Sequence, residues 1–244
     1  MRTISKTCAV LALGAVMANP ADAQSYKEVE VSDGGAISGK VLAGAAKAEA
    51  QTFTITKDPD VCGTGARTVE WVRVNGDALL DVVVYIEEID AGKPFAAEAV
   101  QGTVDQTGCL YTPYLSVMAN GGELSVVNSD GVLHNVHTYE LIKKVRRTVV
   151  NVSQPEGSDP VVKTIKLRRG VAMKVECDVH DFMHAWVFAA QNPYYAVADE
   201  NGEFTITDVP PGTYVVKSWH GRLGEQETTI EVKAGETAAA EFTY

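Results

Sequence analysis

Apolar and polar residues alternate along short segments of this chain, and turn-forming residues separate the segments. Residues 36–42 (AISGKVL) and 70–74 (EWVRV) alternate with a period of two, and residues 78–86 form a longer apolar run. A period of two is typical of a β-strand, whose successive side chains point to opposite faces. The pair Asn75-Gly76 favours a turn after the second segment. The first third of the chain is therefore predicted to be β-structure.

The same pattern continues through the rest of the chain. We expect further strands over residues 114–117, 123–127, 163–167, 171–177 and 185–190. Within VAMKVEC, the period of two places Val171, Met173, Val175 and Cys177 on one face, so the thiol of Cys177 points towards the core. Alanine-rich stretches are too short to change the class. The fold is predicted to be all-β.

Length and composition indicate an exported globular protein. The 244 residues are 45% hydrophobic and 22% charged, enough for one large or two small domains. Residues 1–23 have the pattern of a signal peptide, because Arg2 and Lys6 precede an apolar run and Ala21-Asp-Ala23 offers a cleavage site. The apolar run is too short to span a bilayer. We expect a periplasmic or secreted protein without membrane insertion.

The charge of the chain limits its partners. The formal net charge is −11, and it becomes −12 once the predicted signal peptide is removed. An acidic protein is a poor partner for nucleic acid or an anionic membrane, whereas a basic protein surface would attract it. The basic residues Lys143, Lys144, Arg146 and Arg147 form a local exception. A solvated strand edge or loop is the simpler interpretation, and a docking patch for an acidic partner is the alternative.

Three cysteines remain after export, and this odd count leaves one thiol for another role. Cys177 has neighbours that suit a metal site, whereas Cys62 and Cys109 do not. We therefore predict a structural disulfide between Cys62 and Cys109. The alternative is an intermolecular bridge.

A set of soft metal ligands surrounds Cys177. Cys177, His180 and Met183 have the spacing Cys-x2-His-x2-Met, and His134-Asn-Val-His137 lies upstream. Thiolate and thioether favour Cu(I), while imidazole tolerates Cu(II), so the set suits copper in both oxidation states. Thioether is a poor ligand for zinc. The sequence thus predicts a copper site.

Residues 128–137 followed by residues 175–187 resemble small blue copper proteins, the cupredoxins, and most closely the amicyanin type. That family has the same upstream His-Asn-Val-His and the same short Cys-x2-His-x2-Met loop. The resemblance covers roughly residues 101–190 and implies a Greek-key sandwich with one type 1 copper ion. It implies as ligands His134, Cys177, His180 and Met183, with Asn135 bracing the two ligand loops. His137 and His184 are the alternative ligands.

This sequence departs from the cupredoxin pattern in its prolines. Leu133 precedes the first histidine, and Asp178-Val179 occupies the ligand loop, where the family has proline. Backbone N–H groups then become free to hydrogen-bond the cysteine sulfur, which would alter the reduction potential more than the choice of metal.

Residues 201–220 resemble the second half of a carboxypeptidase-regulatory-like (prealbumin-like) β-sandwich, through a Gly-x-Phe turn and the run Val-Pro-Pro-Gly-x-Tyr. Gly39-Lys-Val41 and residues 81–86 match the first half of such a sandwich. This resemblance implies that a copper domain of residues 101–190 is inserted between two halves, residues 24–100 and 191–244. The combined layout also resembles exported bacterial proteins of the methylamine-utilisation-like type.

The ligand set predicts an electron carrier that is not an enzyme. Phe182 and Trp186 are expected to form an apolar shell that tunes the reduction potential of the copper. His180 or another histidine of the loop is expected to form a partly exposed edge through which electrons leave. The acidic charge suggests a redox partner with a basic face, such as a c-type cytochrome or a periplasmic dehydrogenase. His184 and His220 are more readily explained as structural, although a second metal site is the alternative.

Three other functions fit parts of the sequence. A copper carrier or storage protein would use the same ligands but would exchange the metal. A hydrolase would use Cys177 with His180, but no glycine-rich oxyanion loop surrounds the pair and Met183 would have no role. An extracellular interaction module would explain the carboxypeptidase-regulatory-like strands and leave the Cys-His-Met spacing to chance.

Overall fold

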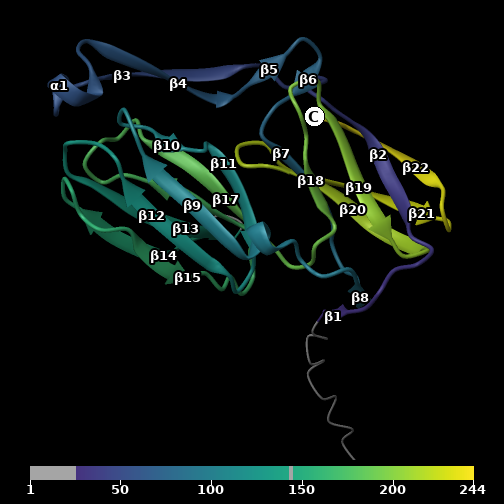
Figure 1. Ribbon diagram of the computed structural model, residues 1–244. Helices are drawn as coiled ribbons and strands as arrows, with labels where there is room; N and C mark the ends of the chain where they lie inside the picture. The colour runs from purple at the N-terminus through teal and green to yellow at the C-terminus, as the bar shows by residue number, and fades with distance from the viewer. Residues whose placement is uncertain (1–25, 143–144) are drawn as a thin grey trace, which may run out of the picture.

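The computed structural model describes residues 26–142 and 145–244, and these residues form two β-sandwiches side by side (Figure 1). The predicted signal peptide, and Lys143 and Lys144 of the basic run, lie outside the described residues. Strands dominate, and the only helices of the described residues are the short α1 (Pro59–Cys62) and the 3-10 helix η1 (Ala97–Val100). The predicted all-β class is confirmed. No helix in this part of the chain is long and apolar enough to cross a membrane.

The first sandwich lies between residues 101 and 190 and consists of two sheets. One has the strand order β10-β9-β12-β15, with β9 (Gln101–Gln106), β10 (Tyr111–Thr112), β12 (Glu123–Asn128) and β15 (Val161–Thr164). The other has the order β11-β17-β16-β13-β14, with β11 (Leu115–Ala119), β13 (His134–Ile142), β14 (Val145–Gln154), β16 (Ala172–Glu176) and β17 (His184–Ala190). Their facing side chains form one core, which includes the fully buried Leu124, Val136 and Met173.

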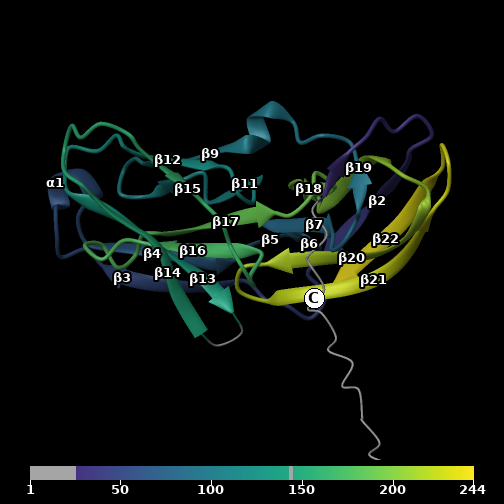
Figure 2. The same cartoon turned by 90° about the horizontal axis from the view of Figure 1, so that it is seen from below.

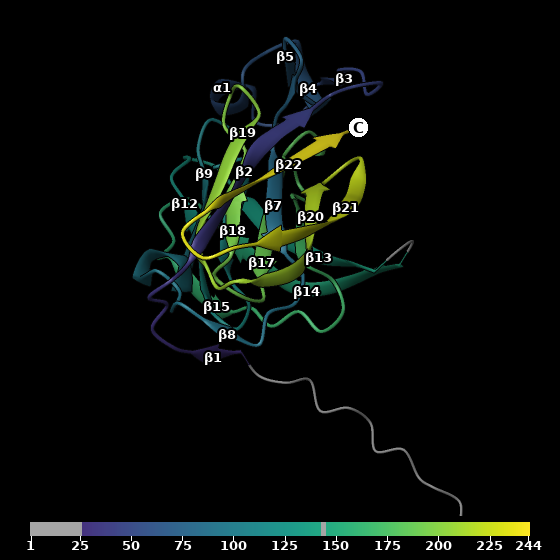
Figure 3. The same cartoon turned by 90° about the vertical axis from the view of Figure 1, so that its right-hand side faces the viewer.

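The second sandwich is built from strands on both sides of that segment. One sheet has the order β18-β7-β20-β21, with β7 (Val82–Ile86), β18 (Tyr195–Val197), β20 (Gly212–His220) and β21 (Gly224–Val232). The other has the order β19-β2-β6-β5, and β22 also pairs with β2; its strands are β2 (Gly35–Leu42), β5 (Val74–Asn75), β6 (Ala78–Leu79), β19 (Glu203–Val209) and β22 (Thr237–Thr243). A short parallel pair, β1 (Lys27–Glu28) and β8 (Ala91–Gly92), lies beside it. Figure 3 views the molecule from this second sandwich.

An aromatic cluster joins the two sandwiches. Trp186 and Phe188 of β17 face Trp219 of β20, with the Trp186 and Trp219 ring centroids 5.5 Å apart. The alternate residues of β17, Ala185 and Val187, belong to the core of the first sandwich. Every residue of β17 is consequently buried. The second sandwich therefore packs on the outer face of the sheet that carries β16 and β17.

The apolar run 78–86 is divided into β6 and β7. Asp81 separates them with a left-handed backbone (φ 59°), and its Oδ2 accepts a hydrogen bond of 2.7 Å from Nε of Arg73. A residue with positive φ cannot continue a strand. The pattern of apolar residues predicted a single strand, whereas the structure has two strands separated at Asp81, which pairs with Arg73.

The segment from β3 (Glu49–Thr54) through α1 to β4 (Ala66–Val72) leaves the second sandwich and runs along the first (Figure 1). We call residues 49–72 the arm. Its two strands pair only with each other, and its Cys62 and Val69 are buried in the core of the first sandwich. In Figure 2, α1 lies at the end of the molecule opposite the second sandwich. The arm thus belongs by packing to the first sandwich, although its residues fall within 24–100.

Candidate metal centre

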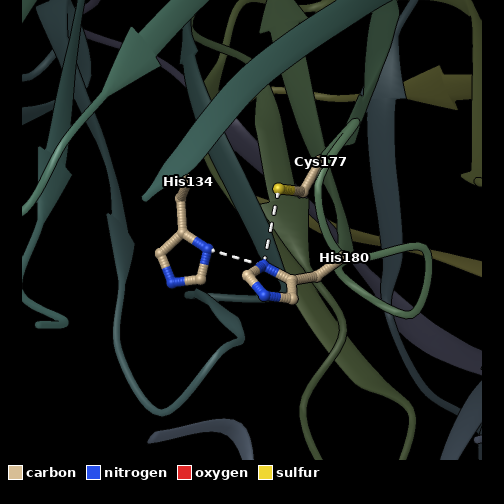
Figure 4. Close-up of side chains that lie close together, drawn as sticks. All are labelled: His134, Cys177 and His180. Carbon is tan, nitrogen blue, oxygen red and sulfur yellow. Dashed lines mark hydrogen bonds between the residues drawn. The ribbon is translucent and has the colours of Figure 1, made fainter. Parts of the chain in front are cut away.

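The predicted ligands gather at one end of the first sandwich because of the pairing of two strands. β13 and β16 are antiparallel, and His137 pairs with Glu176. The start of β13, with His134, therefore lies beside the end of β16, where Cys177 follows. Figure 4 shows the side chains of His134, Cys177 and His180 pointing towards one another. Their donor atoms all lie within 4.8 Å of one another, and all three residues are buried.

Each imidazole ring is held by a carboxylate through its Nε2 atom. His134 Nε2 lies 2.9 Å from Oδ2 of Asp130, and His180 Nε2 lies 3.0 Å from Oδ2 of Asp58. An ionised carboxylate only accepts hydrogen bonds, so each Nε2 is the protonated nitrogen. Burial alone would raise the pKa of Asp130, but N–H donors of Cys109, His134 and Gly108 lower it overall. This arrangement directs both Nδ1 atoms towards the centre of the site.

The two Nδ1 atoms face each other at 3.0 Å, and Nδ1 of His180 lies 4.0 Å from the sulfur of Cys177. With both Nε2 atoms protonated, two neutral rings would place two lone pairs against each other, which is repulsive. A cation between them removes the repulsion. Without a metal, a proton held between the two Nδ1 atoms would serve the same purpose.

The pKa shifts agree with a site that binds a cation. Burial lowers the pKa of His134, but hydrogen bonds with Cys177 and Asp130 outweigh it and raise the pKa overall. The pKa of His180 is lowered, chiefly by burial. Burial raises the pKa of the Cys177 thiol, yet hydrogen bonds from His134 and from the backbone of Asn135, His180 and Val179 lower it overall. The thiolate, which is the form that binds metals, is thereby favoured.

The loop between Cys177 and Met183 is closed by its own backbone. The N–H of Met183 donates to the carbonyl of His180 (3.0 Å), and the N–H of Cys177 donates to the carbonyl of Met183 (3.4 Å). Met183 is 1% exposed and lies in the same core as Cys177 and Phe182. The fourth predicted ligand is therefore buried in the loop that carries two of the other three.

Asn135 links the two ends that carry the ligands. Its Oδ1 accepts the N–H of Asp178 at 2.6 Å and lies 3.5 Å from the sulfur of Cys177, while its Nδ2 donates to Oδ2 of Asp178 at 2.9 Å. The hydroxyl of Tyr111 donates to the carbonyl of Asn135. Asn135 fixes the start of β13 to the ligand loop, in the bracing position that the family resemblance implied.

The other three histidines lie away from this centre. His137 is three positions after His134, so the strand turns its ring to the other face, where it bonds Asp178 and Thr148. His184 packs against Trp71 (ring centroids 4.0 Å apart) and bonds the hydroxyl of Tyr114. Nδ1 of His220 accepts the N–H groups of Arg222 and Leu223. None of them belongs to a group of potential ligands among the described residues.

The expectation that His180 or another histidine of the loop forms a partly exposed edge is wrong, since His180 and His184 are both buried. His180 is 2% exposed, because the arm places Asp58 against its Nε2 edge. Asp58 is 122 positions from His180 in the sequence, and no local pattern connects them. The only hint was the pairing of Cys62, four residues after Asp58, with Cys109. That disulfide is present, which confirms its prediction.

The predicted apolar shell is half right. Phe182 is buried in the core beside the site, with its ring 5.7 Å from that of His180. Trp186 instead faces the second sandwich in the aromatic cluster. The period of two along β17 explains the difference, since Ala185 and Trp186 must point to opposite faces.

The residues fit a small metal ion that takes nitrogen and sulfur ligands. Metal–nitrogen bonds of about 2.1 Å and metal–sulfur bonds of about 2.3 Å allow ligand atoms on one ion to lie at most about 4.4 Å apart. The distances of 3.0 Å between the two Nδ1 atoms and 4.0 Å from His180 Nδ1 to the Cys177 sulfur meet this limit. A second group, formed by Cys109, Asp130 and His134, does not qualify, because the sulfur of Cys109 is bonded in the disulfide.

Comparison with known proteins finds partial likenesses. The family model for polysaccharide lyase family 4, domain II, matches residues 168–240, which run from before β16 into β22. This is less than half of the chain. No curated protein matches the chain.

Several solved structures resemble part of the chain. A purple cupredoxin from Nitrosopumilus maritimus is 17% identical, with 36% of this chain and 99% of that one covered and a TM-score of 0.31. An amicyanin from Paracoccus versutus is 16% identical, with 44% and 97% covered and a TM-score of 0.30. A copper-containing nitrite reductase from Thermus scotoductus is 14% identical, with 40% and 25% covered and a TM-score of 0.30. At these values the likeness concerns the fold alone, and the site must be argued from the residues of this chain.

Proposed function

We propose that this is an exported copper protein of the cupredoxin type that carries single electrons between redox partners. One observation carries the proposal: two imidazole Nδ1 atoms face each other at 3.0 Å beside a buried, free thiol. Lone pairs that face one another in a protein core raise the free energy of the folded state unless a cation lies between them. We propose as ligands His134, Cys177, His180 and Met183.

Copper is the metal that this donor set favours. A thiolate, two imidazoles and a thioether together match blue-copper sites, whereas closed zinc sites take cysteine, histidine and carboxylate. When bound, copper would supply a centre that gains and loses one electron. The chain's own residues would keep water out, and the carboxylates of Asp58 and Asp130 would hold each ring in the tautomer that leaves Nδ1 free.

The same geometry argues against a hydrolase. Cys177 is 5% exposed and His180 is 2% exposed, so a substrate has no direct access to the pair. The Nε2 atom of His180 is already bonded to Asp58, and Nδ1 faces a second ring. We therefore propose a role in electron transfer without an enzymatic activity.

The partner proposed is a redox protein with a basic face, such as a c-type cytochrome or a periplasmic dehydrogenase. The net charge, −11 for the whole chain and −12 without the predicted signal peptide, supports steering towards such a surface. The disulfide between Cys62 and Cys109 supports an exported, oxidising location, because such bonds are rare in reducing compartments.

Copper titration tests the proposal. Metal-free protein given Cu(II) should develop an intense visible thiolate-to-copper band, and Cys177→Ser should abolish it. The matched control is His137→Ala, which removes a histidine of the same motif but one outside the site, and should keep the colour. An unchanged band in Cys177→Ser would show that the ligand assignment is wrong. A copper carrier or storage protein would bind copper equally well but would fail to cycle reversibly in voltammetry and would yield the metal to a chelator.

A further inference from the structure

The arm closes the face of the metal site at which His180 would otherwise meet solvent. It contributes Cys62 and Val69 to the buried core of the first sandwich, and its partly buried Phe53, Ile55, Val61 and Trp71 pack on the same core. Its hairpin has hydrogen-bonded strand partners only within itself. Side-chain contacts and the disulfide, and no sheet ladder, therefore hold the arm in place.

Asp58 is the residue of the arm that reaches the site. It lies just before α1 with a left-handed backbone (φ 47°), a conformation unusual for a residue other than glycine. Its side chain is 38% exposed, whereas the side chain of His180 beneath it is 1% exposed. Asp58 thus forms a boundary between the solvent and a buried imidazole.

A covalent and polar anchor fixes the arm four residues further on. Cys62 is bonded to Cys109, and Arg67 donates hydrogen bonds to the carbonyls of Cys62 (2.8 Å), Gly108 (3.0 Å) and Cys109 (2.7 Å). The N–H of Cys109 in turn donates to the carboxylate of Asp130, which holds His134. The disulfide therefore joins the segment that orients one imidazole to the segment that orients the other.

We propose that the arm is a lid latched by the Cys62–Cys109 disulfide, and that Asp58 is a positioning residue for His180. The closed lid keeps Cys177 from solvent and slows the exchange of bound metal. The part of this inference that concerns metal rests on the proposed function. The part that concerns access to the thiol does not, because it holds for the metal-free protein.

The first experiment measures access to Cys177 without any metal. Full-length metal-free protein is treated with a thiol-specific reagent under native conditions, and mass spectrometry follows the label on the peptide that contains Cys177. We expect Asp58→Ala, and the double variant Cys62→Ser/Cys109→Ser, to react about tenfold faster than the unaltered protein, the scale set by losing a hydrogen bond to a charged group. Asp58→Asn, which keeps an acceptor oxygen, should restore slow labelling.

Asp60→Ala is the matched control, since Asp60 is an exposed acidic residue on α1, two positions after Asp58. It should label at the unaltered rate. Circular dichroism establishes that each variant is folded. Should the double variant fail to fold, Asp58→Ala decides alone, since its side chain is partly exposed and lies outside the core. Equal rates of labelling of Cys177 in Asp58→Ala and in the unaltered protein would contradict the proposal that the arm is a lid.

The second experiment measures loss of copper to a chelator from the copper-loaded proteins. We expect the double variant Cys62→Ser/Cys109→Ser and the variant Asp58→Ala to lose the visible band about tenfold faster than Asp60→Ala. The factor is again the one expected from losing a hydrogen bond to a charged group. If no variant binds copper but thiol access changes as expected, the proposed function fails and the lid stands. If copper binds and its release is the same in all variants, the lid does not govern the metal.

Discussion

Nδ1 of His134 lies 3.0 Å from Nδ1 of His180, while the Nε2 atom of each ring lies against a different carboxylate, Asp130 or Asp58. One ring stands at the start of β13 and the other follows the adjacent end of the antiparallel β16, and both rings are oriented by residues outside these two strands. Their geometry therefore depends on carboxylates as much as on the loops that carry the rings. This dependence yields a prediction at Asp130.

Replacing Asp130 by Asn should weaken copper binding. The carboxylate accepts hydrogen bonds from His134 Nε2 and from the N–H groups of Gly108 (2.6 Å) and Cys109 (2.7 Å). An amide offers one acceptor oxygen and no charge, so at least one of these donors loses its partner. We expect the affinity for copper, measured by competition with a chelator, to fall by about 10- to 100-fold. The exposed Asp159→Asn should bind copper as the unaltered protein does.

Replacing Met183 by Leu should keep copper and raise the reduction potential. Leucine fills a similar volume at a site that is 1% exposed, and such exchanges cost under about 1.5 kcal/mol of stability. In the proposed site the thioether of Met183 would be a weak copper ligand, and its loss would make the cuprous state relatively more stable. Voltammetry measures the potential and the visible band reports the copper. Complete loss of binding would mean that Met183 is not a weak axial ligand.

Glu140 should make the free energy of unfolding depend on pH in the acidic range. Its side chain is fully buried, and Oε1 accepts the N–H groups of Arg168 (3.1 Å), Arg169 (2.9 Å) and Gly170 (2.8 Å). Burial would raise the pKa of Glu140, but these donors and the Arg147 guanidinium hold it at about 2.

Because the folded pKa is below the unfolded one, the stabilisation is complete above the ordinary pKa of 4.5 and is lost as the pH falls towards 2. Glu140→Gln should lower the free energy of unfolding at pH 7 by about 3 kcal/mol and should flatten its dependence on pH between those values. Urea unfolding at a series of pH values measures both effects. The exposed Glu123→Gln should reproduce the unaltered curve, and an equally steep acid transition in Glu140→Gln would assign that transition to other groups.

The features predicted correctly from the sequence are those encoded within a few residues. Alternation gave the strands, because the period of two is a local property of the backbone. The same period placed Met173, Val175 and Cys177 in one core, as the structure has them. It was wrong for Val171, which precedes β16 and packs against the aromatic cluster. The disulfide followed from an odd number of cysteines of which one had metal-ligand neighbours.

The features missed depend on contacts between distant segments. The burial of His180 comes from Asp58, and the break between β6 and β7 comes from the pairing of Asp81 with Arg73. The arm has the alternation of any exposed hairpin, so its own sequence does not indicate that it packs on the first sandwich. The position of Trp186 is different, since the period of two already assigned it to the face opposite Ala185.

The chain leaves and re-enters the second sandwich at neighbouring points. The N–H of Ile86 at the end of β7 donates to the carbonyl of Tyr194, just before β18, at 2.9 Å. The sheet that contains β7 and β18 is thus continuous in space, although the first sandwich lies between these two strands in the sequence. Removing the residues between Ile86 and Tyr194 would expose Trp219 and Tyr85, which are now buried, and would leave two neighbouring strand ends that a short turn can join. The strand pairing of the second sandwich accordingly uses none of residues 101–190.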